Sequence, residues 1–198
     1  MKERSKYQLG KYSDRLLTNY HQATDEEIAK GKDWYPKVNK FITGEGIKWR
    51  LPRIRVGSVV SILSPRNKWE QNLLDAQKVL SAHDKGIHPD QIKVCTFNKN
   101  KYKAFKAARG DIEITDQSLK TYNFVNNIAH LCPESLTIDI WHLRACLGKN
   151  IKIDKSSIGR VAYQQIKSLT IKLAHSLGLE GYEFQAIVWL STQRLTKK

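Results

Sequence analysis

Residues 157–178, SIGRVAYQQIKSLTIKLAHSLG, carry the clearest signal for the fold. Apolar side chains recur there every three or four residues, which places them on one face of a helix. They are Ile158, Val161, Ala162, Ile166, Leu169, Leu173 and Leu177. Ser157 is typical of the residue before a helix, and Gly178 is typical of the position after its end. The stretch therefore predicts an amphipathic helix with one buried face.

The same spacing extends through most of the chain. Thr24 and Glu27 form a capping box at the start of a helix that we expect to end in a loop at residues 44–46. Ser64 and Pro65 predict the cap and first turn of another helix. Apolar spacing also predicts helices at residues 56–63, 102–108, 119–131, 140–147 and 184–191, although the run 59–63 could pass for a strand. The predicted fold class is all-α.

The charge of the chain indicates a polyanionic partner. The 198 residues contain 34 Lys and Arg against 19 Asp and Glu, which gives a formal net charge of +15. The excess lies in three stretches, residues 37–68, 93–109 and 144–172. Nucleic acid is the commonest polyanion that such stretches bind, so DNA is the expected partner. A membrane surface is disfavoured, because the basic residues do not line one long amphipathic helix.

Length and cysteine content set the expected class. The chain fits one domain, in one or two lobes, and shows neither a secretory signal nor an apolar run of the ~20 residues that a membrane helix needs. Cys95, Cys132 and Cys146 cannot all pair within the chain. We therefore expect reduced thiols and a cytoplasmic protein, which would be the host cytoplasm for a phage protein.

Asp139 is the candidate catalytic residue. It lies among apolar residues in the stretch 136–144, just before a predicted helix. One interpretation is structural, with Asp139 as the N-cap of that helix. The other is a carboxylate at the mouth of a cleft, where it stabilises a developing oxocarbenium charge and deprotonates a nucleophile. The two interpretations are compatible, because a capping carboxylate is held in place.

Metal and cofactor chemistry is disfavoured by the motifs. His130, Cys132, His142 and Cys146 could form a metal site, but their spacing lies outside the usual zinc patterns. The chain has neither a Gly-x-x-x-x-Gly-Lys phosphate loop nor a Gly-x-Ser-x-Gly elbow. We therefore expect neither a metal nor a cofactor.

Four stretches resemble the core of the helix-hairpin-helix DNA glycosylases. They are Lys120-Thr121, residues 138–144, residues 58–65 and residues 97–109, so that the resemblance covers about residues 55–147. It implies a two-lobed helical fold in which residues 57–147 form the central lobe and residues 1–56 with 148–198 form the second. It also implies that Asp139 is the catalytic aspartate and that Lys120 matches the Schiff-base lysine of members that cut the backbone.

The resemblance also implies how DNA would be bound. The expected contacts are Arg66, Lys68, Lys99, Lys101, Lys103, Gln117, Ser118 and Arg144. The family grips a phosphate with the open amides of a Gly-x-Gly hairpin, whereas residues 115–119 here contain no glycine and include Asp116. Gln117 and Ser118 would have to substitute. The four-cysteine iron–sulfur loop of some relatives is also missing, since no cysteine follows Cys146.

The whole chain also resembles uncharacterised proteins of phages and prophages. The matching positions are Trp34-Tyr35, Ser64-Pro65, Trp69, Asn72, Asp139, Arg144, Glu183, Gln185-Ala186-Ile187 and Trp189. The expected function is that of a DNA glycosylase-like enzyme, which acts on the N-glycosidic bond of a flipped base in phage or host DNA. The alternatives are a non-catalytic DNA-binding protein that keeps the fold, and a phage-encoded inhibitor of a host protein.

Overall fold

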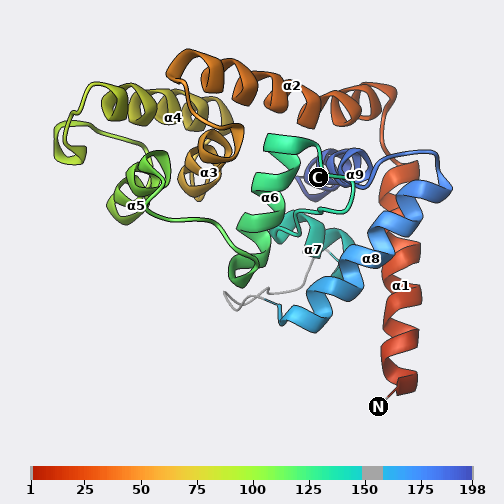
Figure 1. Ribbon diagram of the computed structural model, residues 1–198. Helices are drawn as coiled ribbons and strands as arrows, with labels where there is room; N and C mark the ends of the chain where they lie inside the picture. The colour runs from red at the N-terminus through yellow and green to blue at the C-terminus, as the bar shows by residue number, and fades with distance from the viewer. Residues whose placement is uncertain (1, 149–157, 198) are drawn as a thin grey trace. The chain divides into compact units, whose positions relative to one another are not determined.

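The computed structural model describes residues 2–148 and 158–197, and these ranges contain helices and no strand (Figure 1). The α-helices are α1 (Lys2–His21), α2 (Asp25–Trp49), α3 (Arg53–Leu63), α4 (Trp69–Asp84), α5 (Asn98–Arg109), α6 (Leu119–His130), α7 (Ile140–Leu147), α8 (Arg160–Ser176) and α9 (Gly181–Thr196). Two short 3-10 helices, η1 (Pro89–Gln91) and η2 (Asp116–Ser118), precede α5 and α6. The predicted all-α fold class is confirmed for the described residues, and the ambiguous run 59–63 is helical.

The chain divides into two compact units. Residues 38–131 form the central unit, and residues 1–37 together with 132–198 form the terminal unit. One boundary falls within α2 and the other follows α6. These limits differ from the expected central segment 57–147 at both ends, because the last part of α2 belongs to the central unit and α7 belongs to the terminal unit. In the last part of α2, the Asn39 amide donates to the Ile128 carbonyl at 3.0 Å.

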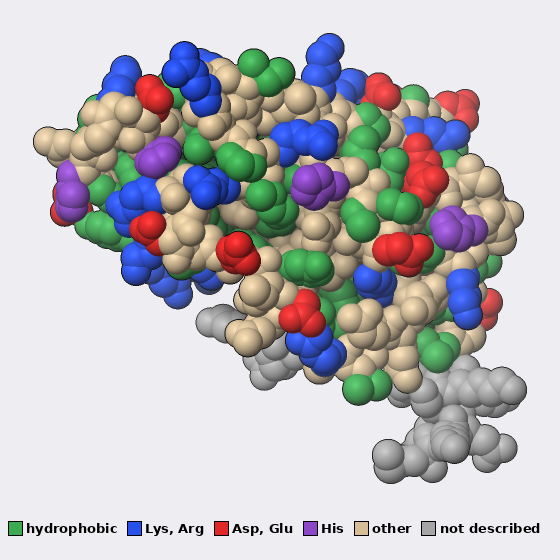
Figure 2. All heavy atoms as spheres, in the orientation of Figure 1, with side chains coloured by type: hydrophobic (Ala, Val, Ile, Leu, Met, Phe, Trp, Pro, Cys, Tyr) green, Lys and Arg blue, Asp and Glu red, His purple; other side chains and the backbone are tan. Residues whose placement is uncertain are grey.

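Helix α3 forms the centre of the central unit and packs against α4, α5 and α6. Its residues 56–63 are all buried, which explains why the sequence there has almost no polar face. A Cβ added to Gly57 would lie only 3.2 Å from the Ala129 Cβ, so glycine allows α3 and α6 to approach closely. Lys and Arg side chains gather over α4 and α5 on the face that Figure 2 shows.

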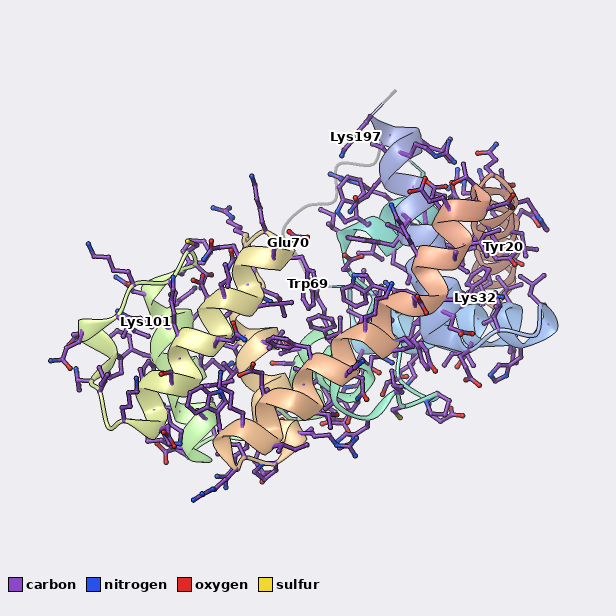
Figure 3. The ribbon with its side chains drawn as sticks, turned by 90° about the horizontal axis from the view of Figure 1, so that it is seen from above. Tyr20, Lys32, Trp69, Glu70, Lys101 and Lys197 are labelled. Atoms are coloured by element: carbon purple, nitrogen blue, oxygen red, sulfur yellow. The ribbon has the colours of Figure 1, made fainter. Side chains whose placement is uncertain are left out.

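The start of α4 is joined to α6 by an aromatic contact. Trp69, labelled in Figure 3, meets the Phe124 ring edge-on at a centroid distance of 6.4 Å. Asn72, one turn further along α4, is fully buried and donates to the Val60 carbonyl at 3.1 Å. These two contacts fix the start of α4 against α6 and α3.

In the terminal unit α1, α7, α8 and α9 pack on one another, and the unit also contains the first part of α2. The predicted capping box is confirmed, since the Thr24 amide donates to Glu27 at 2.9 Å and the Glu27 amide to the Thr24 hydroxyl at 3.2 Å. Helix α2 then crosses α9 closely, because a Cβ on Gly31 would lie 2.8 Å from the Ile187 amide nitrogen. All residues from Phe184 to Val188 are buried, as expected for the core of α9.

The predicted loop at residues 44–46 is wrong, because α2 continues through it to Trp49. The helix ends just before Arg50, whose backbone takes φ 53°, and the Leu51 amide donates to the Gly46 carbonyl at 2.9 Å. A Cβ on Gly46 would lie 2.9 Å from the Leu51 oxygen. Gly46 therefore gives room for the chain to turn over the helix end and does not interrupt the helix.

The prediction for Ser64 and Pro65 is also wrong in position. Ser64 ends α3, with its hydroxyl donating to the Ser61 carbonyl at 2.9 Å, and α4 begins only at Trp69. Between them the chain turns through Arg66, at φ 57°. A turn from residue 64 to 67 occupies the place of the expected first helical turn, since the Asn67 amide donates to the Ser64 carbonyl at 3.2 Å.

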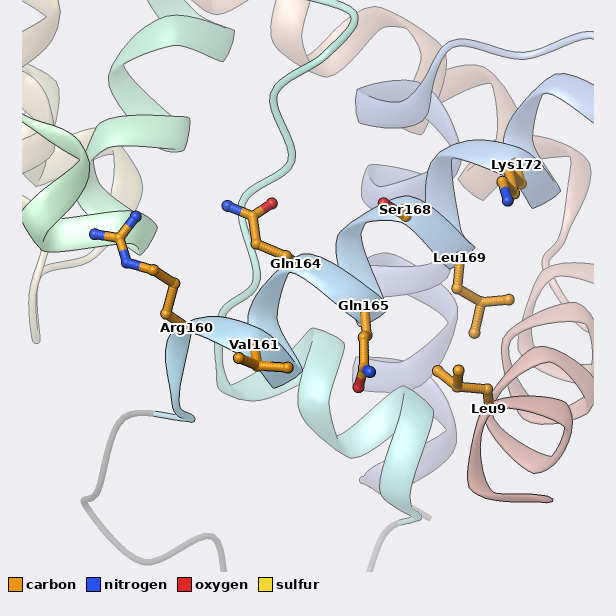
Figure 4. Close-up of a pocket in the computed structure, with 8 residues that line it drawn as sticks. All are labelled: Leu9, Arg160, Val161, Gln164, Gln165, Ser168, Leu169 and Lys172. Atoms are coloured by element: carbon orange, nitrogen blue, oxygen red, sulfur yellow. The ribbon is translucent and has the colours of Figure 1, made fainter. Parts of the chain in front are cut away.

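Helix α8 is confirmed, with Gly178 at its end (φ 69°), but its buried face differs from the predicted one. Val161 is 73% exposed and lies in a groove with Leu9 of α1 and Leu169 (Figure 4). The buried residues are Tyr163, Ile166, Thr170, Ile171 and Ala174. The face is rotated because the Tyr163 hydroxyl is held inside, where it donates to the Leu136 carbonyl at 2.8 Å. The expected cap, Ser157, lies outside the described residues.

Among the helices that the structure describes, none is both long enough and apolar enough to span a membrane.

Candidate functional site

Asp139 is the N-cap of α7, as the sequence predicted. Its Oδ1 accepts the backbone N–H groups of Trp141 at 3.0 Å and of His142 at 2.9 Å. Hydrogen bonds from amides and the positive end of the helix dipole both favour the ionised carboxylate. The side chain is half-buried. Backbone N–H groups of α7 thus fix the orientation of the carboxylate.

Two buried tyrosines support the segment that leads into Asp139. The Tyr163 hydroxyl accepts the Ile138 amide at 3.2 Å while it donates to Leu136, so α8 fixes the three residues before the cap. The Tyr35 hydroxyl donates to Gln185 at 2.8 Å. Burial raises the pKa of Tyr35; a hydrogen bond with Thr137 lowers it, and the Asp139 charge and Tyr163 raise it further. Tyr35 is therefore a neutral hydroxyl close to Asp139.

His142 anchors the first turn of α7 to α8. The side chain is fully buried, and its Nε2 lies 3.1 Å from the Thr170 hydroxyl. Because that hydroxyl donates to the Ile166 carbonyl at 2.9 Å, it can only accept from His142, which assigns the proton to Nε2. Among the described atoms, Nδ1 has no hydrogen-bond partner. Burial lowers the pKa of His142 to about 4, so the imidazole is neutral at physiological pH.

Both ends of α7 are held by charged side chains. At the C-terminal end, the Arg15 guanidinium of α1 donates to the carbonyls of Cys146, at 3.2 Å, and Leu147. A cation at that end stabilises the last carbonyls of a helix. Arg144, an expected DNA contact, is half-buried, and its guanidinium stacks 4.5 Å from the Trp141 ring centroid. The helix that carries Asp139 is therefore fixed at its N-terminus, its first turn and its C-terminus.

Lys120 is exposed in the first turn of α6 and belongs to the central unit, whereas Asp139 belongs to the terminal unit. A lysine nucleophile is activated by desolvation or by a neighbouring cation. Because Lys120 is exposed, its ammonium is not desolvated by the protein. Gln117 and Ser118, just before α6, are exposed as well, and the Ser118 side chain does not cap the helix. All three lie where a phosphate could reach them.

Arg66, Phe97 and Lys99 come together in the central unit, and we call them the Phe97 cluster. The Phe97 ring is 44% exposed, with the Arg66 guanidinium 5.4 Å and the Lys99 ammonium 5.8 Å from its centroid. Arg66 and Phe97 lie in the loops before α4 and α5, and Lys99 lies in the first turn of α5. The two loops are joined by the Thr96 hydroxyl, which donates to the Pro65 carbonyl at 2.9 Å. Exposed aromatic rings beside cations stack on bases while the cations bind phosphates.

Asp75 of α4 holds these loops in place. Its carboxylate is fully buried and accepts the Cys95 amide at 2.7 Å, the Gln71 amide at 2.9 Å and the Asn67 amide at 3.0 Å. Burial alone would raise the pKa of Asp75, but these hydrogen bonds and the Lys78 ammonium bring it below its ordinary value. One carboxylate thus ties the loop before α4 to the loop before α5.

Lys101 does not fit its predicted role as a phosphate contact. Its side chain, labelled in Figure 3, is only 6% exposed, and its ammonium donates to the Ile92 carbonyl at 3.1 Å. Residues 101, 104, 105 and 108 share the buried face of α5, so the helical register turns this lysine inward. Lys68 and Lys103 are exposed.

The residues considered for a metal site do not gather into one. Across residues 2–148 and 158–197, no group of three or more His, Cys, Asp or Glu side chains is placed to hold a metal ion. Cys146 lies in the core, where burial raises the pKa of its thiol to about 12. His142 donates to Thr170 as described above.

Several residues that build the site were not identified from the sequence, among them Arg15, Asp75, Phe97, Tyr163 and Thr170. Phe97 could have been noticed as the aromatic residue in a stretch without acids. Tyr163 and Thr170 gave no signal, because aromatic and threonine residues on a helix are usual in a core. Their role depends on which residues they meet from distant parts of the chain.

No curated protein and no solved structure matches the chain. A family model matches residues 1–196, and the chain therefore belongs to that family, a family of unknown function (DUF7178).

Proposed function

We propose that the protein binds DNA and acts on the N-glycosidic bond of a flipped base, with Asp139 as the catalytic carboxylate. The observation that carries this proposal is the geometry of Asp139. Its carboxylate is oriented by two backbone N–H groups at a helix N-terminus, and the residue is half-buried. A rigid, ionised carboxylate of this kind stabilises positive charge that develops on a sugar.

The surroundings of Asp139 suit that role. As the bond to the base breaks, the sugar becomes an oxocarbenium ion, and a negative charge that is already oriented lowers the barrier without reorganisation. The carboxylate would also accept a proton from the attacking water. Lys120 would be the amine for backbone cleavage, but its exposure favours simple hydrolysis of the N-glycosidic bond as the main reaction.

DNA binding is supported by the Phe97 cluster and by the charge of the chain. The cluster offers a stacking surface and two cations, and Lys68 and Lys103 are further exposed cations of the same unit. The net charge of +15 adds a long-range attraction to phosphates.

A helix-hairpin-helix glycosylase type of fold is part of the same proposal. The all-helical content and the central unit between two terminal segments support it.

A non-catalytic DNA-binding protein is the second candidate. The observation that favours it is the segment 115–119, which contains no glycine and forms the exposed 3-10 helix η2. Asp116 places an acid there, which would repel a phosphate. Under this alternative Asp139 is only a helix cap.

The test compares wild type with Asp139→Asn on duplexes that carry a panel of modified bases, with hot-alkali cleavage to reveal base release. Asn caps a helix about as well as Asp, so stability and DNA affinity should change little. Loss of the charge should reduce base release ~100-fold or more. Asp33→Asn, which removes an exposed carboxylate of α2, is the matched control and should keep full activity.

The two candidates give different results. Base release by wild type that Asp139→Asn abolishes supports the enzyme. DNA binding without base release from any duplex supports the non-catalytic protein, and base release that Asp139→Asn leaves unchanged rules out the proposed role of Asp139.

A further inference from the structure

An apolar groove lies on the central unit between the end of α2, α4 and the segment 87–92. Its volume is about 510 Å³. The lining residues are Lys48, Trp49, Leu74, Gln77, Lys78, Ser81, Ala82, Ile87 and Ile92. None of these nine is acidic. We call it the Trp49 groove.

The groove is preformed because its aromatic wall is fixed. The Trp49 indole donates to Glu45 at 2.6 Å, and the Gln77 amide donates to the other oxygen of the same carboxylate at 2.7 Å. Glu45 is only 7% exposed, so its carboxylate accepts hydrogen bonds inside the unit and is turned away from solvent. A buried carboxylate that joins Trp49 of α2 to Gln77 of α4 keeps the two walls at a constant separation.

The apolar part of the groove is open to solvent. Leu74 is 53% exposed, although it lies on a helix that buries Ala76, Val79 and Leu80 on another face. Leu74 adjoins Trp49, Ile87 and Ile92 in the same groove. Contiguous apolar surface of this kind marks protein interaction sites, and Trp is enriched among the residues that dominate binding energy. Phosphates and sugars of DNA would leave such side chains without an apolar partner.

The rim of the groove is basic. Lys48 and Lys78 are exposed, and the Lys48 ammonium lies 4.6 Å from the Trp49 ring centroid. Lys78 contacts Asp75, at 3.4 Å, which is a buried carboxylate already bonded to three amides. A partner therefore meets apolar side chains in the middle and ammonium groups at the edge.

We infer that the Trp49 groove binds an acidic amphipathic helix of a protein partner. Apolar residues of that helix, spaced by three or four positions, would pack on Trp49 and Leu74, and its carboxylates would pair with Lys48 and Lys78. Charge complementarity speeds the encounter and fixes the orientation, whereas the apolar contacts supply most of the affinity. The groove is thus a second interaction surface, independent of the proposed action on DNA.

The test uses a fluorescein-labelled amphipathic peptide of about 16 residues, long enough to be helical, with leucines on one face and glutamates elsewhere. The intact protein should bind it, and binding should be weaker for a peptide in which lysines replace the glutamates. Leu74→Glu should weaken binding ~10-fold or more, because it places a charge against the apolar face. Val161→Glu changes an aliphatic residue of α8 that is even more exposed than Leu74, and it should have no effect.

Charge reversal provides the second arm. Lys48→Glu with Lys78→Glu should weaken peptide binding ~10-fold. Lys99→Glu with Lys103→Glu, which alters the net charge by the same amount, should preserve peptide binding and reduce DNA binding. An equal loss of peptide affinity in the two double variants would show that the peptide is held by unspecific charge attraction, and it would overturn the inference. Three further results would overturn it. They are no peptide binding by the intact protein, unchanged peptide affinity in Leu74→Glu, and displacement of the peptide by duplex DNA from the Lys99/Lys103 double variant.

Discussion

Two aspartates, one in each unit, are held in opposite ways. Asp75 is fully buried, and its two oxygens accept three amide N–H groups and face Lys78. Asp139 is half-buried, and its cap bonds from Trp141 and His142 both fall on Oδ1. Asp75 joins two loops from a fully buried position, whereas Asp139 caps a helix and is half-buried. The comparison shows that a carboxylate can be fixed either by burial among hydrogen-bond donors from two loops or by the backbone N–H groups of a helix N-terminus.

The same substitution at both sites should separate the two roles most clearly. Asp75→Asn leaves buried amide donors facing an NH₂ group, so we expect the free energy of unfolding to fall by about 3 kcal/mol. Asp139→Asn keeps the cap and should cost less than about 0.5 kcal/mol. Urea denaturation of both variants measures this, and similar losses would contradict the distinction.

Acid should reveal a second contrast, between Asp75 and His142. The pKa of His142 falls from 6.5 in the unfolded chain to about 4 in the folded one. Between these values the unfolded state binds more protons, so stability decreases as pH falls from about 6.5 to about 4, by about 3 kcal/mol in total. The pKa of Asp75 lies below 3.8, so its contribution is present above that pH and is lost only below it.

The measurement is the free energy of unfolding at a series of pH values for wild type and His142→Gln. In the variant, the free energy of unfolding should not decrease between pH 6.5 and 4, and it should still decrease below pH 3.8. A decrease of the same size in the variant would show that His142 does not cause it.

How far the sequence predicts these features depends on the range of the interactions involved. The helix class, the Thr24 capping box and the Asp139 cap follow from neighbours within four residues, and all three are confirmed. The inward turn of Lys101 and the exposure of Val161 depend on tertiary contacts, which spacing alone cannot assign. The predicted loop at residues 44–46 is wrong because glycine there serves a close approach at a helix end.

Two lysines of α5 should sharpen the distinction between buried and exposed cations. Lys99 is exposed beside Phe97, and Lys101 is buried against Ile92. Lys99→Gln should reduce the slope of log affinity for DNA against log salt by ~0.9, the value for one lost phosphate contact. Lys101→Gln should leave that slope unchanged and lower stability. Fluorescence anisotropy over a range of salt concentrations tests both, and an equal change in slope would restore Lys101 as a DNA contact.

The smallest expected effect concerns the backbone of the Phe97 cluster. Arg66 takes φ 57°, a left-handed conformation that costs a residue with a side chain roughly 1–2 kcal/mol. Arg66→Gly removes this strain, partly offset by the greater freedom of glycine in the unfolded chain, so stability should rise by up to about 1 kcal/mol. DNA affinity should fall at the same time, with the salt slope reduced by ~0.9 as one cation is lost.

Arg50→Gly is the matched control, since Arg50 has φ 53° and lies outside the cluster. It should gain similar stability and keep its DNA affinity. A gain in stability with lost DNA binding only at position 66 would show that the chain retains a strained arginine there because the side chain binds phosphate, whereas lost stability at position 66 would show that the Arg66 side chain mainly supports the fold.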